Sequence, residues 1–305
     1  PQRALADYQR FERHVLVDDL DGVKVITLRR PEALNALHDE MTDEILAVIR
    51  RHEDDDAVAG FVITGYGTRS FCAGADIGRF PSMLGDAEAS AQYARDCSRL
   101  LVHLDAMTKP VVAALNGMAL GGGFELAMRC DALVAMRDAW MQLPEITLGI
   151  LPGIGAMVVP YRRWPQAAAV FNGMLLRAER LKAVRAHELG IVDALADDPQ
   201  ALIATAVARV RALAGAARRR PIPDGAIALP PFAEASGPAA GAAVLSRATL
   251  ALMQDAIREA AAAPTLAAGL EAGYRAFGAS ACTAAAREGI AAFHERRSPD
   301  FARTG

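Results

Sequence analysis

NGMALGGGFELA, residues 116–127, is the stretch of sequence that decides the fold. The apolar run at 111–115 before it is typical of a buried strand, and the pattern after the glycines predicts a helix through Cys130. The glycine triplet at 121–123 leaves backbone N–H groups unshielded at the positive end of this helix, which is anion-binding geometry. Close packing of a helix is the alternative explanation of the triplet. A phosphate-binding loop is excluded, because no Lys followed by Ser or Thr comes after the glycines.

Strand and helix patterns alternate on both sides of this stretch. Residues 22–29 and 59–64 are predicted strands, and helical apolar spacing at 38–54 lies between them. Further strands are predicted at 132–135 and 140–143. Successive β–α units of this kind predict an α/β fold in which right-handed crossovers join the strands.

The remaining segments are less regular. Residues 65–80 are predicted to form a glycine-containing loop, and residues 87–104 a single helix. Residues 215–241 are rich in Pro, Gly and Ala, and they are predicted to be a long loop between a core at 1–214 and a C-terminal region at 242–305, with two or three helices between 242 and 296. A flexible linker to a separate small helical domain is the alternative.

The composition excludes several classes of protein. With 305 residues, 52% of them apolar, the chain is long enough to bury a full core. Its formal net charge of -3, with acidic and basic residues mixed, argues against nucleic acid or an anionic membrane as a partner. The four cysteines are far apart, without a CxxC pair or a histidine at zinc-ligand spacing, so we expect reduced thiols and no metal site. The polar residues 1–12 and the absence of a run of about 18 apolar residues predict a soluble, cytoplasmic protein.

Two further motifs follow predicted strands, where α/β folds place their ligand sites. The first is SFCAGAD, residues 70–76, in which Gly74 permits an unusual turn and the Ala75 N–H can then point into a pocket. The second is LPEITLG, residues 143–149, in which Glu145 lies between apolar residues. Such surroundings disfavour a charged carboxylate unless it is paired.

Glu125 has similarly apolar neighbours. Taken alone, each of the two glutamates can be explained as a salt-bridge partner or as an acid in a helical turn. Together the three motifs fit one chemistry. A thioester carbonyl gains negative charge on its oxygen when a nucleophile adds to a conjugated double bond, and two fixed backbone N–H groups stabilise that charge. Two carboxylates can share the water, because one accepts its proton while the other gives a proton to carbon.

The three motifs, in this order and spacing, resemble the crotonase superfamily, which is the enoyl-CoA hydratase/isomerase family. The match covers residues 14–195, including RPEALNAL at 30–37 and LGIVD at 189–193, and residues 286–301 resemble the family's closing helix. The resemblance implies an α/β fold with a crotonase-like ββα superhelix core and a C-terminal helical trimerisation region. It also implies an acyl-CoA thioester as substrate, a homotrimer or hexamer, and no cofactor, because coenzyme A is part of the substrate.

Position by position, the resemblance implies that the amides of Ala75 and Gly122 form an oxyanion hole. It implies that Glu125 helps to activate the water and that Glu145 protonates C2, with roles that can be partly joint. Having both acids favours hydration of a trans-2-enoyl-CoA to a 3-hydroxyacyl-CoA, a hydro-lyase reaction. The residues assigned by resemblance to binding of substrate and coenzyme A are Ala33, Ala36, Ala73, Asp76, Ile77, Gly78 and Gly121.

An isomerase or a hydrolase of the same fold is the alternative, because the sequence departs from the family pattern. Gly78 stands where typical hydratases carry a basic residue, with Arg79 one place later, and residues 156–160 alter the predicted floor of the acyl pocket. Residues 215–241 are longer than most family members need. A non-catalytic homologue that serves as an assembly subunit or binds RNA would lack a carboxylate or carry a basic stripe, and the sequence shows neither.

Other chemically active side chains are predicted to be structural. The six histidines lie outside the motifs, and none is a predicted catalyst. Cys72 has apolar neighbours and is predicted to be a small buried residue instead of a nucleophile. The three arginines at 218–220 are predicted to form a solvated patch, with contact to a coenzyme A phosphate of a neighbouring subunit as the alternative. Asp76 is predicted to brace its loop.

Overall fold

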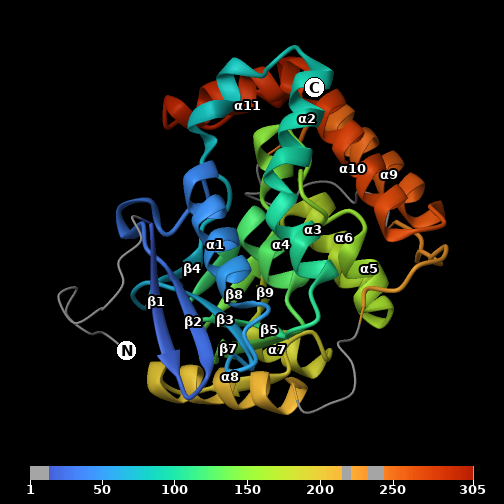
Figure 1. Ribbon diagram of the computed structural model, residues 1–305. Helices are drawn as coiled ribbons and strands as arrows, with labels where there is room; N and C mark the ends of the chain where they lie inside the picture. The colour runs from blue at the N-terminus through green and yellow to red at the C-terminus, as the bar shows by residue number, and fades with distance from the viewer. Residues whose placement is uncertain (1–13, 215–220, 233–243, 305) are drawn as a thin grey trace. The chain divides into compact units, whose positions relative to one another are not determined.

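The computed structural model describes residues 14–214, 221–232 and 244–304, which form two compact units (Figure 1). Of these residues, unit 1 contains 14–76, 99–141, 181–214 and 221, and unit 2 contains 77–98, 142–180, 222–232 and 244–304. Each unit is therefore assembled from segments that are far apart in the sequence.

Unit 1 is built on a six-stranded sheet, of which β2, β3, β5 and β7 are predicted from the sequence, whereas β1 and β10 are not. Its strands, in spatial order, are β1 (Val15–Leu20), β2 (Val23–Leu28), β3 (Gly60–Gly65), β5 (Val111–Leu115), β7 (Ala132–Met136) and β10 (Ala194–Ala196). β1 and β2 form an antiparallel hairpin, whereas every pair from β2 to β10 is parallel. β3 and β5 are buried along their whole length, which explains why they read as short apolar runs instead of alternating patterns.

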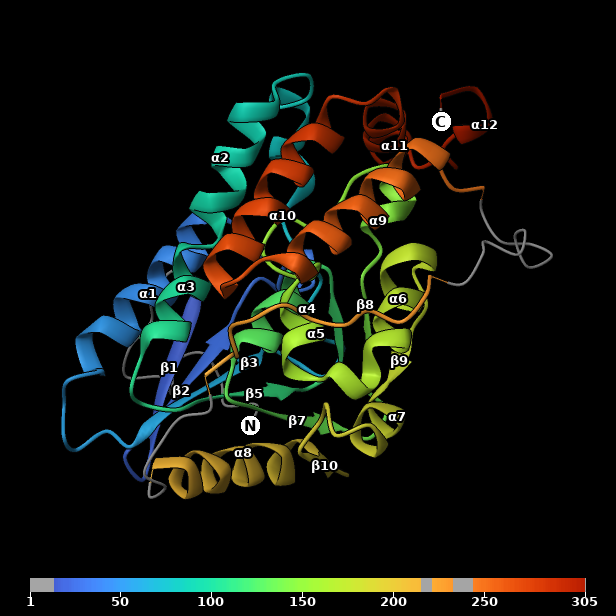
Figure 2. The ribbon, with the colours of Figure 1, turned by 90° about the vertical axis from the view of Figure 1, so that its right-hand side faces the viewer.

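Helix α8 (Pro199–Ala214) covers one face of this sheet (Figure 2). The strands turn every second side chain toward the helix, among them Val62 and Val112, and these belong to one buried cluster with Leu202 and Val210 of α8. Each aliphatic side chain that is fully buried in this way contributes about 1.5–3 kcal/mol of hydrophobic free energy. The sheet and α8 thus give unit 1 a core of its own.

A second, smaller sheet contains strands that the sequence pattern does not reveal. Its members are β4 (Ser70–Cys72), β6 (Met118–Leu120), β8 (Trp140–Gln142) and β9 (Leu181–Lys182). β8 is predicted, but β4 lies within the loop predicted at 65–80, and that prediction is wrong there; β6 lies in a stretch for which no strand is predicted. Strands of two or three residues are too short to show alternation, and for the same reason β9 and β10 carry no strand signal.

Unit 1 contains several helices besides α8. These are η2 (Pro31–Ala33), α1 (Asp39–His52), α3 (Arg99–Ala106), α4 (Gly122–Arg129) and α7 (Ala183–Glu188). The prediction of a single helix at 87–104 is wrong, because α2 (Ala87–Cys97) ends before Ser98 and α3 begins after it, with α2 in unit 2 and α3 in unit 1. Ser98 is buried and is neither glycine nor proline, so nothing local marks the break.

Unit 2 is mainly helical within the described part of the chain. It contains η3 (Ile77–Ser82), α2, η4 (Glu145–Leu148), α5 (Val159–Arg163), η5 (Pro165–Ala167), α6 (Ala168–Arg177), α9 (Arg247–Ala262), α10 (Leu266–Ala281), α11 (Ala284–His294) and α12 (Phe301–Thr304). Helices α9 and α10 lie side by side (Figure 2). Thr265 caps α10 by accepting a hydrogen bond from the Ala268 N–H at 3.1 Å. The prediction of two or three C-terminal helices is confirmed by α9, α10 and α11.

Residues 221–232 belong to the predicted long loop, and they contain no helix or strand. Backbone hydrogen bonds join these residues to the end of α9 and to the turn between α9 and α10. The Gly225 N–H donates to the Pro264 carbonyl oxygen at 2.9 Å, and the Ile227 N–H donates to that of Ala261 at 2.8 Å. This part of the predicted loop is therefore held by backbone hydrogen bonds.

Some predictions concern residues outside the described ranges. These are the polar residues 1–12, the arginines at 218–220 and the part of the loop at 233–241. The domain boundaries at 214 and 241 stay a prediction. None of the helices in the described residues is long and apolar enough to cross a membrane. The α/β fold with a parallel sheet and C-terminal helices is confirmed.

Candidate active site

Helix α4 begins where the glycine triplet predicts. Gly121 is its N-cap, with a φ of 45° that a side chain would rarely tolerate, and Gly122 is the first helical residue. The first hydrogen bond of the helix runs from the Glu125 N–H to the Gly121 carbonyl oxygen, at 2.9 Å. The N–H groups before Glu125, including that of Gly122, therefore have no partner within the helix and lie at the positive end of its dipole.

The loop that carries Ala75 is held so that the Ala75 N–H stays out of the backbone pairing. Ala75 forms an isolated parallel bridge with Leu37. In this bridge the Leu37 N–H donates to the Gly74 carbonyl oxygen, and the Asp76 N–H donates to that of Leu37, both at 2.8 Å. A parallel bridge of this kind uses the neighbours of Ala75 and turns the Ala75 N–H to the other side. Gly74 has a φ of 101°, which explains the glycine at this turn.

Unit 1 brings the Ala75 loop against the start of α4. A Cβ atom placed on Gly74 would lie 3.1 Å from the carbonyl oxygen of Leu120 and 3.7 Å from the amide nitrogen of Gly122. A Cβ atom on Gly123 would lie 2.7 Å from the sulfur of Cys72. Both glycines thus permit a close approach of backbone to backbone, and the two segments with the predicted oxyanion amides pack together.

Glu125 lies within a wholly buried helix. All eight residues of α4 are buried, and Glu125 itself is 3% exposed. At the end of the helix, the buried guanidinium of Arg129 binds Asp105 of α3, with Nε 2.9 Å from Oδ1. Since a buried cation without a partner is costly, this ion pair fixes the end of α4 to α3. The position of Glu125 is thereby set on both sides, by the helix start and by the helix end.

Glu145 lies on a much shorter element of unit 2. It is the first residue of the 3₁₀ turn η4 and is partly buried. The turn ends at Gly149, which has a φ of 69° and leaves no room for a Cβ atom, because that atom would lie 2.5 Å from the carbonyl oxygen of Ala285 in α11. Gly289 of α11 packs on the carbonyl group of Leu148 in the same way. The pairing of Glu145 with Glu125, which belongs to unit 1, stays a prediction.

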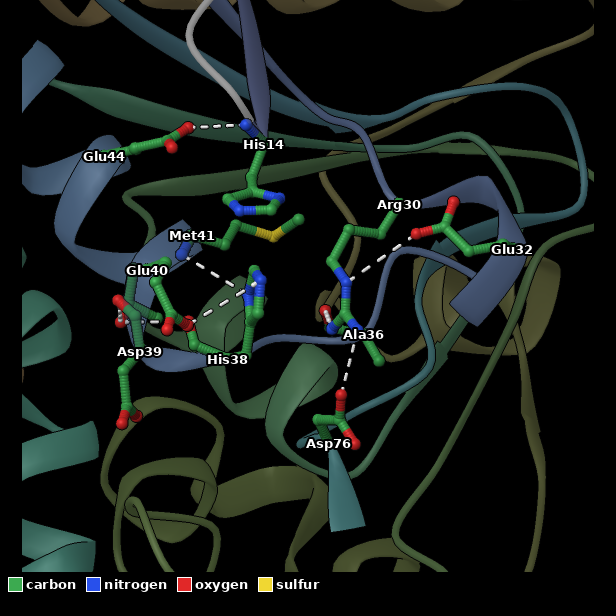
Figure 3. Close-up of polar contacts among 11 residues, drawn as sticks. His14, Arg30, Glu32, Ala36, His38, Asp39, Glu40, Met41, Glu44 and Asp76 are labelled. Atoms are coloured by element: carbon green, nitrogen blue, oxygen red, sulfur yellow. Dashed lines mark hydrogen bonds and ion pairs between the residues drawn. The ribbon is translucent and has the colours of Figure 1, made fainter. Parts of the chain in front are cut away.

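Most of the predicted coenzyme A residues lie on neighbouring loops of unit 1. Ala33 ends η2, Ala36 is largely buried, and the Ala73 N–H donates to the Leu34 carbonyl oxygen at 3.1 Å. Asp76 binds Arg30 (Figure 3). Their contact with substrate is untested and stays a prediction.

The remaining residues of that prediction are in unit 2. Ile77 and Gly78 open η3, and the Gly78 position is exposed. Arg79 is the basic residue that follows Gly78. Its side chain is outside the part of the chain that the structure describes.

Two residues that the sequence analysis does not assign to the site are Arg30 and His38 (Figure 3). His38 is the N-cap of α1, where its Nδ1 accepts a hydrogen bond from the Met41 N–H at 3.3 Å. Burial lowers the pKa of His38, and the nearby charges of Arg30 and His14 lower it further. An N-cap histidine could have been found from its place just before the helical pattern, but the partner of Arg30 could not, because Asp76 lies 46 residues away in the chain.

Cys72 is fully buried, as its apolar neighbours predict. Burial raises the pKa of its thiol to about 12, so a nucleophilic thiolate is strongly disfavoured. Its sulfur lies 3.8 Å from the carbonyl oxygen of Gly74 and packs against Gly123. Cys72 therefore fills the space between the Ala75 loop and α4.

Comparison with known proteins identifies the family. The family model described as enoyl-CoA hydratase/isomerase matches residues 18–220. The chain belongs to the enoyl-CoA hydratase/isomerase family. The resemblance to the crotonase superfamily is thereby confirmed, and the match includes Ala75, Gly122, Glu125 and Glu145.

Several curated relatives of the chain are hydratases by name. The chain is 33% identical over 289 residues to a probable enoyl-CoA hydratase of Mycobacterium leprae, which covers 94% of this chain and 97% of that protein. It is 35% identical over 203 residues to the (E)-benzylidenesuccinyl-CoA hydratase of Thauera aromatica, covering 67% of this chain and 77% of that protein. A solved structure, a carnitinyl-CoA dehydratase from Mycobacterium thermoresistibile, has a TM-score of 0.73 at 24% identity and covers 96% of this chain and 94% of its own. This last likeness supports the enoyl-CoA hydratase/isomerase fold.

Proposed function

We propose that the chain is an enoyl-CoA hydratase, a hydro-lyase that adds water to a trans-2-enoyl-CoA and gives a 3-hydroxyacyl-CoA. The family match and the hydratase names of relatives over most of the chain support this activity. The observation that carries the proposal is the Ala75 N–H, which is left out of the backbone pairing while its loop packs on the N-terminus of α4. Such an arrangement is suited to an oxygen that gains negative charge.

In the proposed reaction the thioester oxygen accepts hydrogen bonds from the amides of Ala75 and Gly122. When water adds to C3, the electron pair of the double bond moves through C2 to this oxygen, and an enolate forms. Fixed N–H donors stabilise the enolate without reorganisation, and removal of one such donor typically slows a reaction about 10²- to 10³-fold. The positive end of the α4 dipole acts on the same charge.

The two glutamates move the protons in this proposal. The carboxylate of Glu125 accepts a proton from the attacking water, whose oxygen bonds to C3. The carboxylic acid of Glu145 donates a proton to C2, which converts the enolate to the saturated thioester. Both glutamates act on the same face of the double bond, so the addition is syn. Their two roles are partly joint, because the acids share one water.

The family does not define which acyl group the enzyme accepts. Residues 156–159, which stand in the altered stretch after Glu145, are buried, and Val158 packs on Gly269 of α10. We therefore propose that this stretch is a packed wall, and that it sets which acyl chain is accepted. One relative is named for an aromatic substrate, benzylidenesuccinyl-CoA, so an aryl acyl group belongs in any test.

We also propose the remaining properties implied by the family. They are a homotrimer or hexamer, a cytoplasmic location, no nucleic-acid or membrane partner, and no cofactor beyond the coenzyme A of the substrate. The formal net charge of -3 supports the absence of a nucleic-acid partner. Size-exclusion chromatography with light scattering tests the assembly.

The activity is tested by following the ultraviolet absorbance of the conjugated thioester. Crotonyl-CoA, longer 2-enoyl-CoAs and cinnamoyl-CoA are incubated with enzyme, and the products are identified by mass spectrometry as 3-hydroxyacyl-CoAs. We expect loss of absorbance with at least one of them and incorporation of one oxygen from ¹⁸O-labelled water. A protein that leaves all of them unchanged is not a hydratase, and a protein that raises the absorbance of a 3-enoyl-CoA without hydrating a 2-enoyl-CoA is an isomerase.

A further inference from the structure

Arg30 lies between the two loops that border Ala75. Its guanidinium donates a hydrogen bond to the carbonyl oxygen of Ala36 at 2.9 Å and another to Oδ2 of Asp76 at 2.9 Å (Figure 3). We infer that Arg30 is a positioning residue for the Ala75 N–H. This inference rests on the proposed function, because it assigns a role to Arg30 within the proposed oxyanion hole.

The two contacts of Arg30 fall on the segments that hold Ala75 in place. Asp76 is joined to Ala75 by a peptide bond, so a shift of Asp76 carries the Ala75 N–H with it. Ala36 immediately precedes Leu37, whose backbone pairs with Gly74 and Asp76 at 2.8 Å on either side of Ala75. Arg30 therefore connects with its side chain the same two segments that Leu37 connects with its backbone.

The backbone of Arg30 is itself held by hydrogen bonds. The Arg30 N–H donates to Oδ1 of Asn35 at 3.1 Å, and the Arg30 carbonyl oxygen accepts from the N–H groups of Ala33 at 3.0 Å and Asn35 at 2.8 Å. Asn35 is 1% exposed, and its Nδ2 donates to the carbonyl oxygen of Ser70 at 2.9 Å. The backbone from which the guanidinium extends is thus held by hydrogen bonds within its turn, and Asn35 joins that turn to the segment at Ser70.

Burial and distance distinguish this ion pair from an ordinary surface contact. The Arg30 side chain is 16% exposed and Asp76 is 41% exposed, whereas the other acid near Arg30, Glu32, is 72% exposed with its Oε1 3.9 Å from Nε. An exposed pair of this second kind contributes little. The short hydrogen bond to Asp76 from a largely buried guanidinium is the stronger of the two interactions.

The shape of the guanidinium matters as well as its charge. Nη1 and Nη2 point to different acceptors, so one planar group spans the carbonyl oxygen of Ala36 and the carboxylate of Asp76. A lysine at this position keeps the charge but presents a single nitrogen on a flexible stem. Arg30→Lys therefore separates the geometry of the clamp from its electrostatics.

The test uses three variants and one matched control. R30M removes the clamp, R30K keeps only its charge, and D76N removes the negative partner. R209M is the control, because Arg209 also forms a partly buried ion pair in unit 1, with Nη2 2.8 Å from Oδ1 of Asp193. The control pair includes α8, and its residues have no part in the proposed site.

Two readouts distinguish positioning from a merely structural role. The first is kcat and KM for hydration of crotonyl-CoA. The second is the absorbance of bound 4-dimethylaminocinnamoyl-CoA, whose push–pull chromophore shifts to the red as its thioester carbonyl accepts stronger hydrogen bonds. A loss of global stability lowers the concentration of folded enzyme and leaves both kcat per folded molecule and this red shift unchanged.

We expect R30M to lower kcat about 10- to 100-fold, with a much smaller change in KM, because a displaced amide stabilises the transition state poorly. The red shift should fall in R30M and be only partly restored in R30K, and R209M should match the wild type in both readouts. If R30M does not fold, R30K and D76N decide by the same two readouts. Wild-type kcat and a full red shift in the folded Arg30 and Asp76 variants would overturn the inference.

The outcome also separates this inference from the proposed function. A wild type that shifts the chromophore but hydrates no enoyl-CoA refutes the hydratase proposal, and the Arg30 clamp is then judged by the red shift alone. A wild type that hydrates crotonyl-CoA while R30M keeps its kcat refutes the clamp alone. A wild type that binds the chromophore without any red shift refutes the oxyanion hole and the clamp with it.

Discussion

The elements that carry Glu125 and Glu145 are built in opposite ways. Glu125 lies in the middle of α4, whose eight residues are all buried and whose end is tied to α3 by the ion pair of Arg129. Glu145 opens the four-residue 3₁₀ turn η4, in which only Ile146 is buried. The first glutamate is held by a complete helix, whereas the second depends on what lies against a single turn.

The difference locates the supports of each acid. Around α4 the support is local, because Gly121 starts the helix and intrahelical hydrogen bonds continue it. Around η4 the support comes from far along the chain, since Gly149 and Leu148 pack on Ala285 and Gly289 of α11. Changes in the C-terminal helices should therefore disturb Glu145 much more than changes of the same size in α8 disturb Glu125.

The largest expected effect is the loss of either acid. E125Q and E145Q keep the size of each side chain but remove its acid–base function, so each should lower kcat/KM for an accepted enoyl-CoA by roughly 10²- to 10⁴-fold. Steady-state kinetics of the absorbance change measures this effect. E259Q is the control, because Glu259 forms an exposed ion pair with Arg275. Wild-type rates in E125Q or in E145Q would remove that residue from the mechanism.

The second effect breaks the support of Glu145 without touching the acid. In G289A the new Cβ atom would overlap the carbonyl group of Leu148, so η4 has to move. We expect a loss of about 1–3 kcal/mol in the free energy of unfolding and a fall in kcat per folded enzyme. The measurements are denaturant unfolding and kinetics.

The matched control for G289A is G273A, which also places Ala within a C-terminal helix. Its Cβ atom would lie 3.6 Å from Cε of Met157, an ordinary contact, and Ala favours a helix over Gly. G273A should keep its activity and be as stable as the wild type or more stable. If G289A and G273A behave alike, α11 does not support the Glu145 turn.

The smallest expected effect is a dependence of stability on pH in unit 1. Only a neutral imidazole can accept the Met41 N–H with Nδ1, and burial lowers the pKa of His38 below its usual value of 6.5. The unfolded chain therefore binds this proton more readily. The His38 contribution is complete above about pH 6.5 and is lost as the pH falls through the lower pKa of the folded state.

The variant H38N tests this dependence, because Asn caps a helix without titrating. Wild type and H38N are unfolded in urea at pH 7.5 and at pH 5.0. We expect the wild type to lose more stability on acidification than H38N does, by about 1 kcal/mol or less. Equal losses in the two proteins would show that His38 does not couple protonation to the folding of unit 1.

The sequence predicts the parts of the site that are local. Residues 111–130 are recognised as strand, glycine turn and helix, because each of these patterns is complete within a few residues. Strands β4 and β6 escape prediction, since three residues show no period. The clamp of Arg30 on Asp76 and the packing of Gly289 on Leu148 join segments distant in sequence, and no local pattern reports them.

The measurement that tests the central claim most directly is a double-variant cycle of Glu125 and Glu145. The claim is that both acids act on one water, so that removal of either disables the same step. The double variant E125Q/E145Q should then be little slower than the slower single variant, as for catalytic groups that act as a unit. Rate losses that multiply, with the double variant as slow as the product of the two single losses, would contradict the claim.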